Sequence, residues 1–168
     1  MNNVHFKSSD REWETPDAVF QPLKKEFNIL IDVCATAENT KCKAYFDRKL
    51  NGLTVNWAEK LKLIGGVNAA CWMNPPYGRG VDTWIKKAYD ESLRGVTTVA
   101  LIPARTDTSW FHTYIHGKQE VRFIKGRIKF VDAESSAPFP SMVVIFRPPL
   151  NKQTNKWIKY LKLMRVIQ

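Results

Sequence analysis

Four largely apolar runs along the chain are too short for ordinary helices and have the composition of strands buried on both faces. They cover residues 28–34, 67–73, 96–102 and 142–146. Two weaker strand candidates lie at residues 44–47 and 53–57. The pattern therefore predicts a sheet whose central strands are covered on both sides.

Helical periodicity occupies the segments between these runs. A first helix is predicted to begin with Thr15 as N-cap and Pro16 at the first helical position, and its apolar face holds Val19, Phe20, Leu23 and Phe27. Residues 84–93 show the same spacing and are followed by Gly95, a residue typical of helix C-termini. A short third helix is predicted over residues 107–116.

The end of the chain has a different pattern. Val121, Phe123, Ile128 and Phe130 alternate with charged residues around Lys125-Gly126, which predicts an antiparallel hairpin. Strands alternate with helices before this point, so the sequence favours the α/β class: a Rossmann-like, mostly parallel sheet with a C-terminal antiparallel hairpin and helices on both faces. We expect one domain over residues 1–168, with a loose segment at 1–12 and a basic amphipathic helix at 151–168.

The positive charge of the chain is concentrated in two segments. The 168 residues carry a formal net charge of +10. Residues 117–130 hold five basic side chains and one acid, residues 147–168 hold six basic side chains and no acid, and these two segments account for the whole excess. A polyanionic partner such as a nucleic acid is expected.

The cysteines indicate a reducing compartment. Cys34, Cys42 and Cys71 are an odd set without metal-ligand spacing, which is typical of reduced thiols in a cytoplasmic protein. No apolar segment opens the chain and no run approaches membrane-spanning length, so we expect no signal peptide and no membrane contact. Neither a metal site nor an obligate protein partner is indicated.

The tetrapeptide Asn74-Pro75-Pro76-Tyr77 is the most informative motif, because it directly follows a predicted buried strand. Open α/β sheets bind ligands at the carboxyl ends of such strands. The prolines stiffen the loop and have no N–H to donate, so the loop offers carbonyl acceptors, to which Asn74 adds a side-chain oxygen and Tyr77 a flat ring. Two acceptors and a stacking surface suit a planar exocyclic amine such as that of adenine. The alternative is a proline-rich turn with no chemical role.

A series of further elements accompanies this motif in order along most of the chain. They are Trp13-x-Thr15-Pro16, Asp32-x-x-Ala35 with Glu38-Asn39, Leu53 to Trp57, Asn74-Pro75-Pro76-Tyr77, Trp84-x-x-Lys87-Ala88, Leu101-x-Pro103-Ala104-Arg105-Thr106-Asp107 and Gly126-Arg127-x-Lys129-Phe130. The series resembles the phage-type DNA adenine-N6 methyltransferase family, a branch of the class I S-adenosylmethionine-dependent methyltransferases. The Asn-Pro-Pro-Tyr element alone also occurs in methyltransferases that act on protein glutamine or RNA guanine.

The resemblance implies an adenine-specific enzyme. A methyl group would pass from S-adenosyl-L-methionine to N6 of an adenine flipped out of DNA, leaving S-adenosyl-L-homocysteine. The catalytic residues would be Asn74, Pro75, Pro76 and Tyr77, in a phage or prophage protein acting in the bacterial cytoplasm. The chain departs from the class I pattern by having no glycine in residues 32–37, and it has no insert large enough for a separate target-recognition domain.

The expected cofactor-binding residues are Trp13, Thr15, Pro16, Asp32, Cys34, Ala35, Asp47, Asn56, Trp57 and Asn74. Asp32 could instead cap the turn that follows it. Asp47 is expected at ribose hydroxyls, as an acid after a second strand, but could equally be a surface acid. Trp57 could be part of the core and not of the site.

The expected DNA contacts are Arg79, Arg105, Lys125, Arg127 and Lys129. A salt bridge in solvent is the alternative for Arg105, and a solvated hairpin face is the alternative for the last three. Other functions stay open at this point: a methyltransferase of the same fold acting on RNA or on a protein glutamine amide, or a non-catalytic DNA-binding protein. For the adenine reaction, catalysis is expected to come from positioning and electrostatics, without a nucleophilic cysteine.

Overall fold

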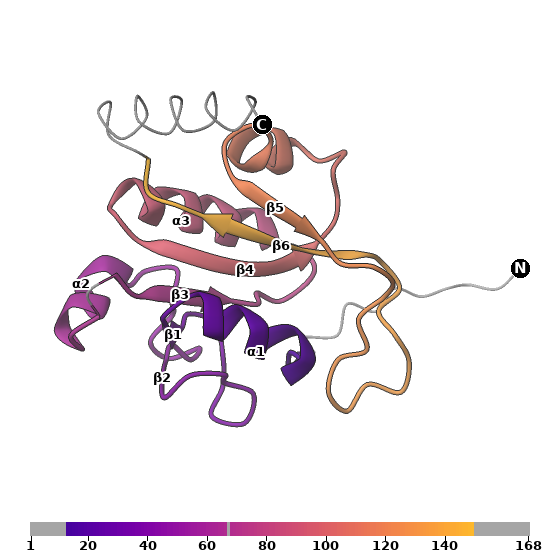
Figure 1. Cartoon of the computed structure of the whole chain (residues 1–168), viewed down its shortest axis with the longest axis horizontal. Coiled ribbons are helices and arrows are strands. Elements are labelled where there is room, and N and C mark those ends of the chain that lie inside the picture. Colours follow the sequence, from indigo (N-terminus) through magenta and orange to yellow (C-terminus); the bar gives the residue numbers. More distant parts are fainter. Residues whose placement is uncertain (1–12, 67, 150–168) are drawn as a thin grey trace, which may run out of the picture.

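A six-stranded sheet organises the chain, and the computed structural model describes residues 13–66 and 68–149 of it (Figure 1). The strand order is β2-β1-β3-β4-β6-β5. The strands are β1 (Ile29–Asp32), β2 (Ala44–Tyr45), β3 (Ala70–Met73), β4 (Thr97–Pro103), β5 (Glu120–Phe123) and β6 (Ser141–Phe146). The helices are α1 (Asp17–Glu26), α2 (Trp57–Leu63), α3 (Val81–Leu93) and the π-helix η1 (Phe111–Ile115).

The pairing confirms the predicted mixed sheet. Strands β2, β1, β3 and β4 are joined by parallel pairing, whereas β6 pairs antiparallel with β4 on one side and with β5 on the other. The chain passes from β1 outward to β2 and then returns to β3 on the opposite side of β1. This reversal leaves a crevice at the carboxyl ends of β1 and β3, the position at which open α/β sheets bind ligands.

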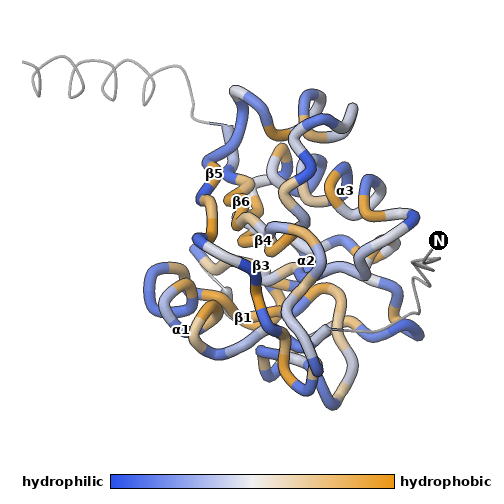
Figure 2. Tube along the Cα trace, turned by 90° about the vertical axis from the view of Figure 1, so that its right-hand side faces the viewer, coloured by the Kyte–Doolittle hydropathy of each residue, from blue (hydrophilic) through white to orange (hydrophobic). Residues whose placement is uncertain are grey.

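Both faces of the sheet are covered, as its continuous apolar strands require. Figure 2 shows α1 on one side of the strands and α2 and α3 on the other. In β4, Val99 and Leu101 belong to the cluster that contains the α1 residue Phe20. The neighbours Ala100 and Ile102 belong to the cluster of α2, α3 and η1. Successive side chains on a strand point to opposite faces, so every residue of this strand interior is buried.

Several predicted elements are corrected by the structure. Residues 53–57 are not a strand: Trp57 begins α2, and Asn56 is its N-cap, with its side chain accepting a hydrogen bond from the Glu59 backbone N–H. Residues 128–130 are not a strand either: they lie in the long connection between β5 and β6, and β5 pairs with β6. The N-cap of α1 is Pro16 and not Thr15. The predicted helix at 151–168 and the loose segment at 1–12 lie outside the described residues.

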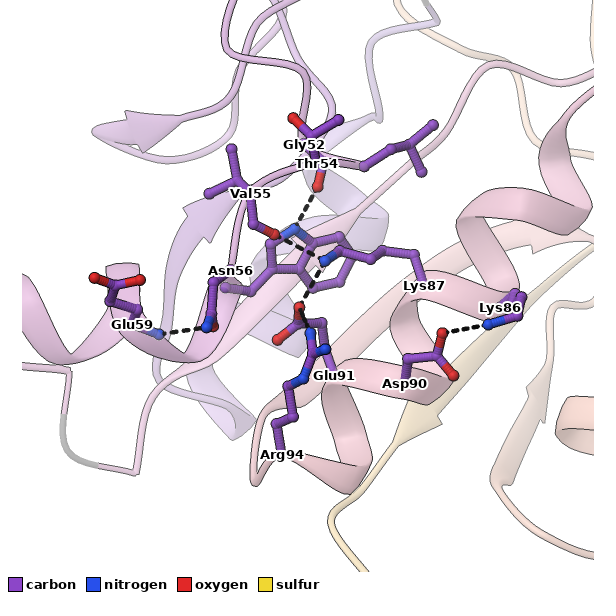
Figure 3. A network of polar contacts seen from close by, with 12 residues as sticks. Gly52, Thr54, Val55, Asn56, Glu59, Lys86, Lys87, Asp90, Glu91 and Arg94 are labelled. Atoms are coloured by element: carbon purple, nitrogen blue, oxygen red, sulfur yellow. Dashed lines mark hydrogen bonds and ion pairs between the residues drawn. The ribbon is translucent and has the colours of Figure 1, made fainter.

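The loop between β2 and α2 is held in place by polar contacts from side chains of α2 and α3 (Figure 3). The Trp57 indole N–H donates to the Gly52 carbonyl at 2.7 Å, and the Lys87 amine donates to the Val55 carbonyl at 2.8 Å. The same amine forms an ion pair with Glu91 at 2.7 Å. Glu91 is completely buried and also pairs with Arg94 at 2.9 Å. One side chain of α3 thus links a buried carboxylate to the backbone of a loop.

The Lys87–Glu91 pair predicts a large stability effect. In Lys87→Met, the buried Glu91 carboxylate keeps only Arg94, so we expect the free energy of unfolding to fall by about 3 kcal/mol, because removing one partner strands a desolvated charge. Urea unfolding measures this loss. The matched control is Lys86→Met on the same helix, which breaks the exposed Lys86–Asp90 pair and should change stability little. Equal losses in the two variants would contradict the assignment.

Candidate functional site

A cavity of about 300 Å³ lies at the carboxyl ends of the parallel strands. Its wall is built by the segments that follow β1, β2 and β3, together with the segment that precedes α1. The lining residues are Trp13, Thr15, Asp32, Cys34, Ala35, Asn39, Phe46, Asp47, Arg48, Asn51, Gly52, Trp72, Asn74, Pro75, Pro76 and Trp84. This volume is at the lower end of the range for small-molecule sites.

The segment before α1 is held by contacts to the end of β3 and to the loop between β1 and β2. The Asn74 side-chain N–H₂ donates to the Trp13 carbonyl at 2.6 Å. The Lys41 amine pairs with Glu14 at 2.8 Å and with Asp17 at 3.1 Å. Residues that are distant in sequence therefore close one side of the cavity. The Lys41 bonds were not anticipated from the sequence, where a lone lysine carries no positional signal.

Two buried polar atoms of the wall have no hydrogen-bond partner among the described residues. They are the side-chain oxygen of Asn74 and the hydroxyl oxygen of Thr15. Because the amide N–H₂ of Asn74 is held by the Trp13 carbonyl, its oxygen is the atom left as an acceptor. A buried acceptor without a partner costs free energy, so both atoms indicate a place where a ligand supplies a donor.

Asp32 at the end of β1 is almost completely buried, with 3% of its surface exposed. One carboxylate oxygen accepts from the Lys41 backbone N–H at 3.1 Å and the other from the Cys34 backbone N–H at 3.4 Å. The carboxylate therefore does cap the following turn, while also lining the cavity. Burial raises the pKa of Asp32 to about 7, against the two hydrogen bonds, which favour the charged form.

Gly52, in the loop after β2, lies very close to the backbone just after β1. A Cβ atom on Gly52 would lie 2.1 Å from the Val33 carbonyl oxygen and 3.1 Å from the Trp84 ring. The loop therefore lies against the backbone just after β1, beside residues 32–37, which contain no glycine of their own. Any larger residue at this position would displace the cavity wall.

The sequence missed several residues of the wall. Gly52 and the side chains of Asn39, Phe46, Arg48, Asn51, Trp72 and Trp84 were not expected there. Arg48 and Asn51 follow β2, and the place of that strand in the sheet is the only signal that could have found them. Trp84 lies in the first turn of α3, directly after the Asn-Pro-Pro-Tyr loop.

Three expected cofactor residues are not brought to the cavity. Asn56 uses its side chain as the cap of α2. Trp57 is fully buried in the core, where its indole N–H donates a hydrogen bond to the Gly52 carbonyl. Pro16 is the cap of α1 and is absent from the wall. The other expected cofactor residues line the cavity, and their contact with a cofactor stays a prediction.

Tyr77 is oriented differently from its three neighbours in the motif. Asn74, Pro75 and Pro76 line the cavity, whereas the Tyr77 ring lies 5.8 Å from Phe130 and 5.4 Å from Phe139, centroid to centroid. Its hydroxyl donates to the Leu101 carbonyl at 3.3 Å. Burial raises the pKa of this phenol. The half-buried ring is thus held by aromatic neighbours beside the cavity and does not form its wall.

The basic residues fall into two groups. Arg122 and Arg147 are paired with acids, the first with Glu26 and Glu120 and the second with Glu120. In contrast, the expected DNA contacts are all exposed, namely Arg79, Arg105, Lys125, Arg127 and Lys129. Within residues 13–66 and 68–149, no ion pair is formed by any of these five. Of the five basic side chains in residues 117–130, Arg122 is therefore neutralised locally, which charge counting could not foresee.

The described part of the chain has three cysteine thiols and no disulfide: Cys34 and Cys42 are half-buried and Cys71 is buried. No helix among the described residues has the length and apolar character needed to cross a membrane. Those residues also contain no group of three or more His, Cys, Asp or Glu side chains placed to hold a metal ion.

Comparison with known proteins identifies relatives over most of the chain. The family model described as DNA N-6-adenine-methyltransferase (Dam) matches residues 3–162. A DNA N-6-adenine-methyltransferase of Haemophilus phage HP1 (strain HP1c1) is 31% identical over 157 residues, covering 88% of this chain and 86% of that protein. A DNA N-6-adenine-methyltransferase of Escherichia phage T1 is 27% identical over 139 residues, covering 73% of this chain and 55% of that protein. The resemblance expected from the sequence is confirmed.

The raised pKa of Asp32 predicts a specific dependence of stability on pH. In the unfolded chain an aspartate has a pKa near 3.9, so the folded state binds this proton more tightly. The stability that comes from this proton is fully present below about pH 4 and is lost as the pH rises to about 7. The free energy of unfolding of the wild type, relative to Asp32→Asn, should therefore fall between pH 4 and pH 7 and then level off.

Urea unfolding of both proteins at several pH values measures that difference. The constant difference above about pH 8 combines the cost of burying the charged carboxylate with the hydrogen bonds that the amide cannot replace, and only the sloping part reports the proton. A difference that stays flat from pH 4 to pH 8 would show that Asp32 ionises at an ordinary pKa.

Proposed function

Because the chain belongs to the DNA N-6-adenine-methyltransferase family, we propose that it methylates N6 of adenine in DNA, using S-adenosyl-L-methionine, with the target base turned out of the duplex. The observation that carries the proposal is the buried, unpartnered side-chain oxygen of Asn74 at the carboxyl end of β3. An acceptor fixed in that place suits an N–H₂ group. The exposed basic residues Lys125, Arg127 and Lys129, which form no ion pair within the described parts of the chain, suit a phosphate backbone.

The amino group of adenine is a weak nucleophile, because its lone pair is delocalised into the ring. The Asn74 side-chain oxygen and the Pro75 carbonyl would accept hydrogen bonds from the two amine hydrogens. Such bonds draw the nitrogen toward a pyramidal geometry and return the lone pair to it. Acceptors that are already fixed before the reaction need no reorganisation, which is the usual source of such electrostatic catalysis.

The cavity also fits the proposed cofactor. S-adenosyl-L-methionine supplies a methyl group on a positively charged sulfur and leaves as S-adenosyl-L-homocysteine. Its ammonium and ribose hydroxyls are donors, and the wall offers Asp32, Asp47 and the unpartnered Thr15 oxygen as acceptors. Its adenine ring needs flat apolar surface, which Phe46, Trp72 and Trp84 provide.

Base flipping is proposed because the adenine must leave the duplex to reach the cavity. The amino group of a paired adenine is inside the duplex and cannot reach a cavity at the end of a sheet. Tyr77 lies beside the cavity with its ring braced by Phe130 and Phe139, and we assign it the surface on which the extruded base stacks. The reaction would take place in the cytoplasm of a bacterial host, where the DNA of a phage or prophage lies.

Two other acceptors share the same chemistry. An RNA base or a protein glutamine amide also presents a planar N–H₂ group. Nucleoside mass spectrometry of DNA and RNA, together with peptide mass spectrometry of the proteins, from expressing, methylation-free cells separates the possibilities. N6-methyladenine in DNA supports the proposal, while methylation confined to RNA or protein, or none at all, contradicts it.

Asn74→Ala should abolish methyl transfer. Losing one fixed hydrogen-bonding group in the transition state typically costs about 3 kcal/mol or more. The Asn74 bond to Trp13 is also lost, but Glu14 stays bonded to Lys41 and to the Val131 N–H, so the affinity for S-adenosyl-L-homocysteine should weaken only modestly. Single-turnover methylation and calorimetric titration measure the two effects. Activity within a few-fold of the wild type would overturn the assignment of Asn74.

Tyr77→Phe should be mild and Tyr77→Ala severe. The Phe variant loses only the 3.3 Å hydrogen bond to the Leu101 carbonyl and keeps the ring against Phe130 and Phe139. The Ala variant loses a base stack worth roughly 1–3 kcal/mol. The ratio of turnover number to Michaelis constant for DNA tests this. If Phe proves as damaging as Ala, the hydroxyl and not the ring carries the function.

A further inference from the structure

The connection between β5 and β6, residues 124–140, is the longest link between elements in the described part of the chain. Because β5 and β4 both pair antiparallel with β6, they run in the same direction. The connection therefore leaves the sheet at the carboxyl edge, where the cavity opens. Figure 1 draws it in orange, extending beyond the end of β4. Loops of this length without helix or strand are uncommon in compact domains and are usually functional.

Buried residues anchor the loop next to the site. Ile128, Phe130 and Ala137 are at most 7% exposed and belong to the cluster under α1. The Phe130 ring lies 5.2 Å from that of Trp13, which lines the cavity. The Val131 backbone N–H donates to the Glu14 carbonyl at 3.1 Å. The loop is thus tied to the segment before α1, and any DNA it contacts is held at a fixed distance from the site.

Further contacts connect the loop to the Asn-Pro-Pro-Tyr motif and join its own two halves. The Tyr77 ring packs against the rings of both Phe130 and Phe139. Within the loop, the Ala137 backbone N–H donates to the Ile128 carbonyl at 2.8 Å. A recognition element needs this kind of support, because a contact that moves by an ångström loses its selectivity.

The exposed residues of the loop form a basic stem and a polar tip. The stem is Lys125, Arg127 and Lys129, which alternate with the buried anchors. The tip is residues 131–136, where Asp132, Glu134, Ser135 and Ser136 are exposed. Asp132 has φ of +57°, a left-handed conformation that makes the turn sharp and that aspartate and asparagine tolerate best.

We propose that residues 131–136 read base pairs beside the target adenine, while Lys125, Arg127 and Lys129 hold the adjacent phosphates. Packing alone explains the buried anchors but not the exposed tip. Two carboxylates would repel a phosphate backbone, and they are suited to a different contact, since Asp and Glu accept from the amino group of cytosine. Phosphate contacts position a protein and base-edge contacts specify the sequence, so the division of the loop matches the two tasks.

This inference rests on the proposed function, so its test has a binding readout that needs no catalysis. The affinity of the full chain is measured for a panel of duplexes that differ by one base pair beside a central adenine. Relative methylation of the same panel is measured in parallel. Three double variants are compared with the wild type: Asp132→Asn with Glu134→Gln, Lys125→Ala with Lys129→Ala, and the control Lys60→Ala with Lys62→Ala on α2, which runs away from the cavity.

The tip variant should lose discrimination among duplexes by roughly ten-fold at the contacted position. The stem variant should bind all duplexes more weakly, with the slope of log affinity against log salt reduced by roughly 0.9 for each lost phosphate contact. The control should match the wild type in both respects. These results would support the proposal.

An unchanged discrimination profile in the tip variant, or a wild type that binds all duplexes equally, would overturn base reading by the loop. An unchanged salt slope in the stem variant, or a slope reduced as much in the control, would overturn the phosphate contact. Absence of N6-methyladenine with the wild type, together with the expected binding changes, would refute the proposed function and leave the loop as a DNA-reading element.

Discussion

The hydrogen bond from the Asn74 amide to the Trp13 carbonyl is the interaction on which the site depends. It joins the end of β3 to a segment that precedes the first helix, and it holds that segment over the carboxyl ends of the strands. It also fixes the orientation of the amide, because a carbonyl partner requires the N–H₂ group. The oxygen is thereby left buried, beside the cavity that Asn74 lines and without a hydrogen-bond partner among the described residues. One contact both closes the wall and prepares the acceptor.

The loops around the cavity are held from outside it by long side chains. Lys41 reaches the segment before α1, and Lys87 reaches the Val55 carbonyl from α3. The Trp57 indole supports the Gly52 carbonyl. Trp57 and Lys87 each use one polar group to hold a backbone carbonyl, whereas Lys41 holds the side chains of Glu14 and Asp17. The cost is a fully buried carboxylate, Glu91, whose charge is balanced by Lys87 and Arg94.

Some basic side chains are neutralised by neighbouring acids, whereas others are exposed to solvent. Arg122 and Arg147 lie where β5 and β6 approach the end of α1, and the acids Glu26 and Glu120 neutralise them. The exposed basic side chains on the loop after β5 have no such partners among the described residues. Since unpaired surface cations interact with phosphates at little desolvation cost, the local balance of charge is a better guide to a DNA-facing surface than the total.

The sequence by itself determined the class of fold, because apolar runs buried on both faces and helical periodicity between them leave few alternatives to a covered parallel sheet. It also determined the family, through a series of motifs in order along the chain. The stiffness of the Asn-Pro-Pro-Tyr loop could be predicted as well, because the fixed φ of each proline does not depend on distant residues. It could not determine which residues share the cavity. Asn56 and Trp57 lie close in sequence to Gly52, yet the indole turns into the core while the glycine lies at the wall. Tertiary structure alone decided this, since the carboxyl ends of three strands and the segment before α1 meet only after the sheet has formed, and side chains then turn toward whichever surface buries them.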